Sequence, residues 1–143
     1  MADMVAKSRT KTGSELYYRY LPPNIPLRAI RQFARRIAER FDPSQIILFG
    51  SFAYGKPHKW SAVDLLVVMP IYSEIRQSIR ITLAFDPVFP LDLIVSTPER
   101  LRRRPAEGDS FLQEITTKGI LLYEKRNPVV GRKGGKRLSR SSK

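Results

Sequence analysis

The sequence contains no cysteine, which excludes a disulfide framework and a metal site built on thiolates. It also lacks any apolar run of the about 18 residues that a membrane span requires. Residues 1–11 lack the apolar stretch of a signal peptide. We therefore expect a soluble protein of the reducing cytoplasm that has no membrane partner.

Acidic residues are scarce. The 143 residues include 26 Lys and Arg but only 13 Asp and Glu, a formal net charge of +13 that suggests a nucleic-acid partner. However, eight of the positive charges lie within residues 125–143, which hold no acid. Residues 27–124 carry 14 positive and 11 negative charges, so this segment is only mildly basic, at +3.

The length, the 42% hydrophobic content and the mean hydropathy of −0.30 are typical of one globular domain. Residues 125–143 are rich in Gly, Ser and Lys and cannot bury enough apolar surface to fold alone. We expect an N-terminal arm (1–23), a folded domain (24–124) and a disordered basic tail (125–143). The arm contains three tyrosines that are expected to lie on the domain or on a partner: Tyr17, Tyr18 and Tyr20.

Three short apolar runs predict buried strands, at residues 45–49, 62–69 and 90–96. Between the second and third, Ile75, Ile79 and Leu83 recur at the spacing of a helix, which predicts a helix over 73–84. A last strand is expected at 120–123. The fold class is therefore α/β or α+β, with a small mixed sheet flanked by helices.

Capping residues predict the other helices. Apolar residues recur every three or four positions from Leu27 to Phe41, with Asn24 upstream as the expected cap and arginines between them as a solvated face or a phosphate surface. Thr97 and Asp109 are expected to cap a short turn and a helix over 110–118, which Gly119 ends.

Three features could carry chemistry. Gly50-Ser51 directly follows the first predicted strand, where small residues can present N–H groups and a hydroxyl to a phosphate. An ordinary turn at the end of a strand would have the same sequence pattern. Asp64 and Asp92 each lie within an apolar strand, where an unpaired carboxylate is costly to bury. Two such carboxylates on one face of neighbouring strands would suit a hard cation such as Mg²⁺.

These residues resemble the minimal nucleotidyltransferases (MNT) of the DNA polymerase β superfamily. In that family, Gly-Ser is followed after ten residues by Asp-x-Asp on the next strand and by a third Asp on a later one. Here ten residues separate Gly50-Ser51 from residues 62–64, and Asp92 takes the third place. The resemblance extends from about Leu27 to Glu124 and implies a polymerase-β-like nucleotidyltransferase fold.

One departure concerns the metal ligands, because Ala62 replaces the first Asp of the family's pair. Residues two apart on a strand share a face, so both family carboxylates can reach the metal. By the resemblance, Asp64 and Asp92 hold Mg²⁺, and Asp92 also helps to deprotonate the incoming hydroxyl. Without the third carboxylate, transfer should slow by on the order of 10²–10³-fold or more. Ala62 is either a natural loss or a substitution introduced to trap an inactive form, and the intact surroundings favour the second.

The loop after Gly50-Ser51 departs from the family's frequent Arg-x-Arg-Gly. Gly50, Ser51 and Lys56 are the expected nucleotide contacts. Lys56 or Lys59 could contact the triphosphate, although a solvated loop lysine is the favoured alternative. Trp60 is expected to pack on the sheet rather than to stack on a base. The basic run 102–104 is either a solvated turn or a surface for an acidic partner.

The resemblance implies a transferase that binds ATP and Mg²⁺ and moves a nucleoside monophosphate to an acceptor hydroxyl. Short members are similar to the MNT antitoxins of HEPN–MNT toxin–antitoxin pairs, which neutralise a HEPN ribonuclease by adenylylating a tyrosine on it or by binding it. The alternative is a nucleic-acid-binding or RNA-modifying nucleotidyltransferase whose basic tail grips phosphates. An aminoglycoside-modifying enzyme is disfavoured, since a polycation needs an acidic pocket.

Overall fold

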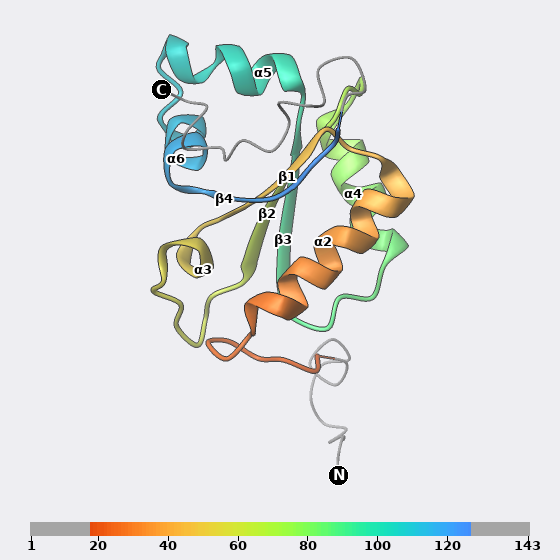
Figure 1. The fold of residues 1–143 in the computed structure, drawn as a ribbon, viewed down its shortest axis with the longest axis vertical. Helices are drawn as coiled ribbons and strands as arrows, with labels where there is room; N and C mark the ends of the chain where they lie inside the picture. The colour runs from red at the N-terminus through yellow and green to blue at the C-terminus, as the bar shows by residue number, and fades with distance from the viewer. Residues whose placement is uncertain (1–17, 127–143) are drawn as a thin grey trace.

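The computed structural model describes residues 18–126 as a four-stranded sheet between two layers of helices (Figure 1). This arrangement confirms the predicted small mixed sheet with flanking helices. The elements in chain order are α2 (Leu27–Phe41), β1 (Gln45–Phe49), α3 (Ser51–Tyr54), β2 (Val63–Val68), α4 (Glu74–Ala84), β3 (Leu91–Ser96), α5 (Pro98–Arg103), the 3₁₀ turn η1 (Pro105–Glu107), α6 (Ser110–Lys118) and β4 (Ile120–Glu124).

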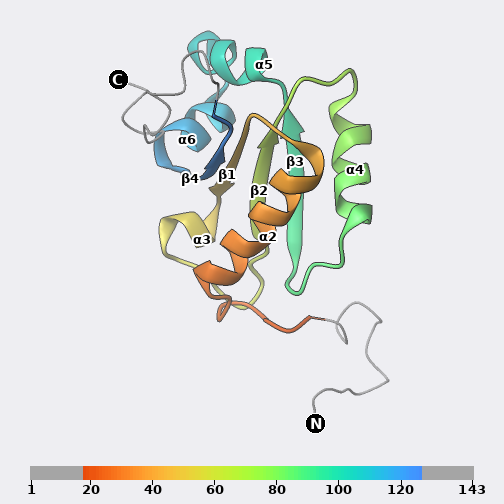
Figure 2. The ribbon, with the colours of Figure 1, turned by 45° about the vertical axis from the view of Figure 1, so that its right-hand side comes forward.

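The strands follow the order β3-β2-β1-β4 across the sheet. β1 runs antiparallel to both of its neighbours, whereas β2 and β3 are parallel and are joined by the crossover helix α4. The view in Figure 2 shows α2 and α4 side by side on one face of this sheet, and α6 on the other. The parallel pairing brings the beginnings of β2 and β3 to the same end of the sheet.

Alternate strand residues build two separate cores. Odd-numbered positions of β2, such as Leu65 and Val67, pack under α2 and α4 in the larger core. Even-numbered positions, such as Leu66 and Val68, pack against α5 and α6 in a smaller core. Because α5 and α6 cover only part of their face, the even-numbered residue at the start of β2 is left half-buried.

Two of the predicted caps are confirmed, and one is wrong. Thr97 accepts a hydrogen bond from the Arg100 N–H (3.1 Å), and Asp109 accepts one from the Leu112 N–H (3.0 Å). Asn24 does not cap α2, whose N-cap is Pro26 without a side-chain hydrogen bond. The reason is steric, because a residue before proline disfavours helical backbone angles and Ile25 precedes Pro26.

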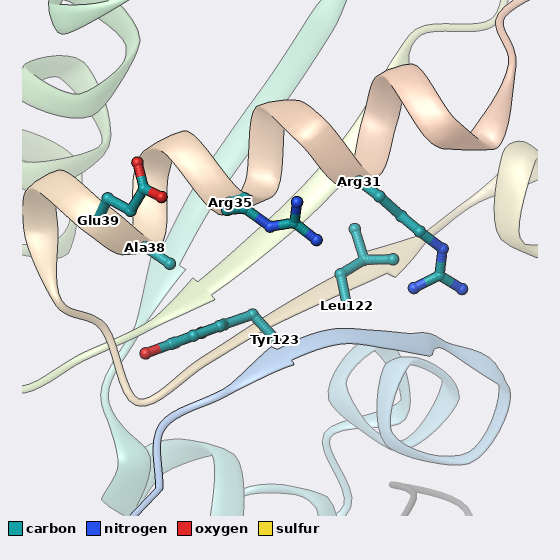
Figure 3. Close-up of a pocket in the computed structure, with 6 residues that line it drawn as sticks. All are labelled: Arg31, Arg35, Ala38, Glu39, Leu122 and Tyr123. Atoms are coloured by element: carbon teal, nitrogen blue, oxygen red, sulfur yellow. The ribbon is translucent and has the colours of Figure 1, made fainter.

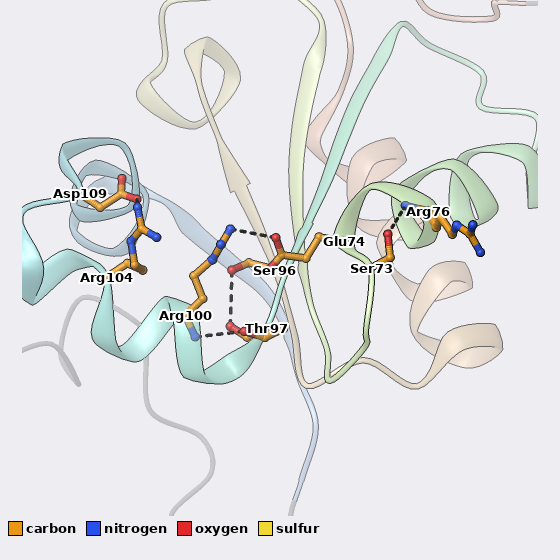
Figure 4. A network of polar contacts seen from close by, with 8 residues as sticks. All are labelled: Ser73, Glu74, Arg76, Ser96, Thr97, Arg100, Arg104 and Asp109. Atoms are coloured by element: carbon orange, nitrogen blue, oxygen red, sulfur yellow. Dashed lines mark hydrogen bonds and ion pairs between the residues drawn. The ribbon is translucent and has the colours of Figure 1, made fainter.

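Two of the three arginines in the basic run 102–104 form local ion pairs, and Figure 4 shows Arg104 next to Asp109. Arg103 lies between Glu99 and Glu107, with both N–O distances at 3.2 Å, and Arg104 approaches Asp109 at 3.5 Å. The neighbouring Arg100 reaches across to Glu74 at the start of α4 (2.9 Å). These contacts favour the structural interpretation of the run over a partner surface.

The predicted tail (125–143) lies outside the described residues except for Lys125 and Arg126, and so does Tyr17. Tyr20 does lie on the domain, as expected, because its N–H donates to the Val88 carbonyl (2.9 Å) and its ring packs on the larger core. Within residues 18–126, none of the helices has the length and apolar character needed to span a membrane.

Candidate active site

The two predicted carboxylates lie opposite one another. Asp64 is the second residue of β2 and Asp92 the second residue of β3, and the parallel register pairs them directly. Residues paired in this way lie on neighbouring strands about 4.8 Å apart and face the same side of the sheet. Asp92 is exposed and Asp64 is half-buried, so the pair opens to solvent at the uncovered end of the smaller core.

Burial and the neighbouring Asp92 carboxylate perturb the pKa of Asp64. Burial, the negative charge of Asp92 and a hydrogen bond with the Asp92 carboxyl raise the pKa of Asp64 from 3.8 to about 6. A carboxyl held against another carboxylate resists ionisation because two like charges repel at short range. The same arrangement attracts a divalent cation, which relieves that repulsion.

Gly50 lies beside Asp64, on the side away from Asp92. Its backbone has φ +76° and ψ −163°, a conformation that is essentially restricted to glycine. A Cβ atom at this position would collide with the Asp64 carboxylate. Glycine at position 50 therefore lets the turn after β1 approach the carboxylates closely.

Ser51 is the first residue of the four-residue helix α3. The N–H groups of Ala53 and Tyr54 both donate to the Gly50 carbonyl. The Ser51 hydroxyl donates to the Ser61 hydroxyl (2.9 Å), which also accepts from the His58 N–H (2.9 Å). These bonds tie the turn after β1 to the loop that leads into β2. Gly50 thus lies beside Asp64, and Ser51 follows it at the start of α3.

The loop residues are less closely associated with the pair. Lys56 is exposed just after α3 and makes no ion pair with a carboxylate of residues 18–126. The prediction that Trp60 packs on the sheet is wrong, because its side chain is 80% exposed. The loop carries it away from the domain, and the Lys59 ammonium lies 5.2 Å from its ring centre.

Sequence reasoning did not single out Tyr54, the last residue of α3. Burial, together with the Glu114 carboxylate of α6, raises the pKa of the Tyr54 hydroxyl, and Asp64 contributes in the same direction. Tyr54 therefore lies between the carboxylate pair and α6. Only its position in the loop after Gly50-Ser51 could have pointed to it, because Glu114 is 60 residues away in the chain.

The residues present fit a magnesium ion incompletely. Mg²⁺ is commonly held by one or two carboxylates, with water and substrate phosphates filling the remaining positions, and Asp64 and Asp92 are suited to that role. Within residues 18–126, no three Asp, Glu, His or Cys side chains gather into a metal cluster. Ala62, just ahead of β2, holds the place where a third carboxylate would share the face of Asp64.

A separate hollow of about 370 Å³ lies between α2 and the edge strand β4 (Figure 3). The guanidinium groups of Arg31 and Arg35 extend over it from α2, and Leu122 and Tyr123 line it from β4. None of the residues of the carboxylate pair or the Gly-Ser turn lines this hollow. It is therefore a second, positively charged feature of the surface.

The fold and the carboxylate pair together define a domain of the nucleotide-transferring class. The family model for the nucleotidyltransferase domain matches residues 30–123, and the chain belongs to this family. The family supports nucleotidyl transfer as the general activity.

A solved structure from Sulfolobus solfataricus, provisionally described as a nucleotidyltransferase, superposes with a TM-score of 0.51 at 17% identity, over 69% of this chain and 80% of that one. At this identity the likeness supports the fold alone. No curated protein matches the sequence.

Proposed function

We propose that the protein is an MNT-type antitoxin that transfers AMP from ATP to a tyrosine of a HEPN ribonuclease, or neutralises that ribonuclease by binding it. The observation that carries the proposal is the register pairing of Asp64 with Asp92 beside Gly50-Ser51.

Each residue of the site would have its own role in the transfer reaction. Asp64 and Asp92 would hold Mg²⁺, which when bound neutralises charge on the triphosphate. Backbone N–H groups of the Gly50-Ser51 turn, with Lys56, would bind its phosphates. The acceptor oxygen attacks the α-phosphorus of ATP, the bond to pyrophosphate breaks, and Asp92 takes the hydroxyl proton. Asp64 acts by positioning, since its carboxylate is fixed between Gly50 and Asp92.

Ala62 sets the expected level of activity. It supplies no oxygen ligand, so the site would hold a cation with two carboxylates rather than three. Removal of a preorganised electrostatic group typically costs 10²–10³-fold in rate. The protein with Ala62 should therefore transfer AMP slowly, while binding of a protein partner needs no metal ligand.

The experiment measures transfer of label from α-labelled ATP to a HEPN protein with Mg²⁺ present. The Ala62→Asp variant should label a tyrosine of that protein faster than the unmodified chain does. The expected increase in rate is on the order of 10²–10³-fold. The matched control is Ala62→Asn, which adds the same volume without a carboxylate and should not accelerate transfer. Adding Asp92→Asn to Ala62→Asp should remove the gain.

The outcomes separate the parts of the proposal. If Ala62→Asp neither labels nor binds the HEPN protein but still forms pyrophosphate from ATP with another acceptor, the antitoxin role is wrong and nucleotidyl transfer stands. If it forms no pyrophosphate with any acceptor, the transfer chemistry itself is contradicted. Stable binding of the HEPN protein without labelling would support neutralisation by binding.

A second candidate, action on or binding of a nucleic acid, is favoured by the arginines over the hollow between α2 and β4. Phosphate groups bind guanidinium pairs well. On this alternative, affinity for a short RNA falls steeply with salt, and Arg31→Glu combined with Arg35→Glu lowers it at least tenfold. RNA affinity that is unchanged in this double variant would rule out that surface.

A further inference from the structure

The crossover helix α4 has apolar side chains on both of its faces. Ile81 and Gln77 face the sheet and are buried, with Ile81 0% exposed. On the opposite face, Ile75, Ile79 and Leu83 are 75%, 52% and 79% exposed. We call these three residues the α4 stripe. They recur every four residues, so they form one continuous seam along the outside of the helix.

Exposed aliphatic side chains are unremarkable when scattered singly, but a contiguous seam of them marks an interaction surface. Tyr72, just ahead of α4, is also fully exposed. Figure 2 shows α4 at the outer edge of its layer, where no other described element covers its outward face. The seam is therefore open along the whole helix.

The charges beside the seam are positive. Arg76 and Arg80 lie on the flank of α4 that adjoins α2, are exposed, and form no ion pair with residues 18–126. The opposite flank offers only Glu74, which already binds Arg100 (2.9 Å). A partner that covers the seam would therefore meet uncompensated arginines on one side.

A hollow extends this surface on the arginine side. It measures about 560 Å³, lies between the end of α2 and α4, and is lined by Arg40 and Arg80 together with Phe41 and Leu83. Its apolar floor and cationic rim suit a bulky apolar side chain next to a carboxylate. Leu83 belongs to the α4 stripe and also lines the hollow, so the two surfaces are continuous.

We propose that the α4 stripe is a docking surface for an amphipathic helix of another protein that carries acidic residues along one flank. Apolar side chains at four-residue spacing are the usual contacts between one amphipathic helix and another. The proposal goes beyond nucleotidyl transfer, since the docking surface includes neither Asp64 nor Asp92. It lies on the layer of α2 and α4, whereas the carboxylates open to the other face of the sheet.

Charge excludes the nearest alternatives. In a two-fold antiparallel pair of α4 helices, equal flanks meet, so Arg76 and Arg80 would face the same arginines of a second copy and repel them. The chain's own segments outside the described residues are no better suited. Residues 127–143 hold six basic and no acidic residues, and residues 1–17 hold three basic and two acidic ones.

The test uses two labelled helical peptides of about 18 residues, long enough to form helix, with identical leucine seams. One carries glutamates along a flank, and the other carries lysines at the same positions. Fluorescence anisotropy with the full chain should show the glutamate peptide binding at least tenfold more tightly than the lysine peptide. The combined Ile75→Ser, Ile79→Ser and Leu83→Ser substitutions should weaken it at least tenfold, whereas Leu21→Ser, at another exposed leucine, should not.

Charge reversal gives a second arm that does not depend on the apolar residues. Arg76→Glu with Arg80→Glu should invert the preference toward the lysine peptide, whereas Arg102→Glu on α5 should leave it unchanged. Equal binding of both peptides, or none, overturns the proposal. So does a dimer that the serine substitutions dissociate, binding that appears only when residues 127–143 are removed, or preferential binding of anionic lipid vesicles.

Discussion

The carboxylate of Asp64 occupies the position that a Cβ atom on residue 50 would take, so only glycine at residue 50 leaves room for it. The turn after β1 and the second residue of β2 are thereby locked together, with Asp92 on the far side of Asp64. A side chain added at residue 50 must therefore displace the Asp64 carboxylate. This relationship connects the Gly-Ser turn, which suits phosphate, with the carboxylates, which suit a cation.

Gly50→Ala should therefore destabilise the fold and disturb the site together. The new methyl group meets Asp64 and also requires a backbone conformation that costs roughly 1–3 kcal/mol. Urea unfolding measures the loss. Gly55→Ala is the control, since Gly55 also has a positive φ (77°) but nothing lies within 4 Å of its position. An equal loss for both variants would contradict the close approach of Gly50 to Asp64.

Asp64→Asn should stabilise the metal-free protein in a pH-dependent way. The folded-state pKa of about 6 lies above the ordinary 3.8, so the folded state binds the proton more tightly, and the associated stability is lost as the pH rises from about 4 to 6. A fully buried group with this shift would lose about 3 kcal/mol. Because Asp64 is only half-buried, we expect a gain of about 1 kcal/mol for the variant above pH 6.

Urea unfolding in EDTA at pH 4 and pH 7.5 tests this prediction. The gain should be present at pH 7.5 and should vanish at pH 4. Asp86→Asn, at an exposed acid away from the pair, controls for the loss of a negative charge from the chain. A gain that is equal at both pH values, or equal to that of Asp86→Asn, would contradict the raised pKa of Asp64.

The two faces of α4 should differ sharply in stability. Ile81→Ala removes a fully buried side chain of the larger core and should cost about 2–5 kcal/mol. Ile79→Ala removes an exposed side chain of the α4 stripe and should change stability by less than about 0.5 kcal/mol. Thermal unfolding of the pair of variants measures the contrast. Similar losses would mean that the stripe is covered within the isolated chain.

Gly119→Ala should destabilise the end of α6. A Cβ there would lie 2.5 Å from the Ile115 carbonyl oxygen and 2.7 Å from a methyl carbon of Ile47. Overpacking of this kind costs about 1–3 kcal/mol. Lys118→Ala, on the adjacent exposed residue, is the matched control for urea unfolding. A loss no greater than that of the control would show that the backbone of α6 can move away from β1 freely.

Most of the site could be predicted from the sequence because its signal is local. The number of residues between Gly50-Ser51 and Asp64 is fixed by one turn and one loop, and an Asp within an apolar strand is conspicuous. The pairing of Asp64 with Asp92 needed the strand register, which the sequence does not encode locally. Gly119 was expected to end α6 and does, but its backbone is extended (φ −70°, ψ 162°), and close packing is what requires glycine there.

The remaining differences arise from tertiary contacts. The four-residue spacing of Ile75, Ile79 and Leu83 located α4 correctly, but hydrophobic periodicity does not say which face meets the sheet, and Ile81 on the opposite face does so. Trp60 was expected to pack on the sheet, yet its side chain is 80% exposed in the loop that leads into β2. No local pattern distinguishes these cases.

Binding of Mn²⁺, a paramagnetic substitute for Mg²⁺, tests most directly whether Asp64 and Asp92 form a metal site that lacks one ligand at Ala62. Free Mn²⁺ measured by electron paramagnetic resonance, with ATP present, should show weak binding by the unmodified chain and at least tenfold tighter binding by Ala62→Asp. Ala62→Asn should bind as the unmodified chain does, and Asp64→Asn combined with Asp92→Asn should abolish protein-dependent binding. Mn²⁺ affinity that is unchanged by Ala62→Asp and by the double substitution would contradict the account.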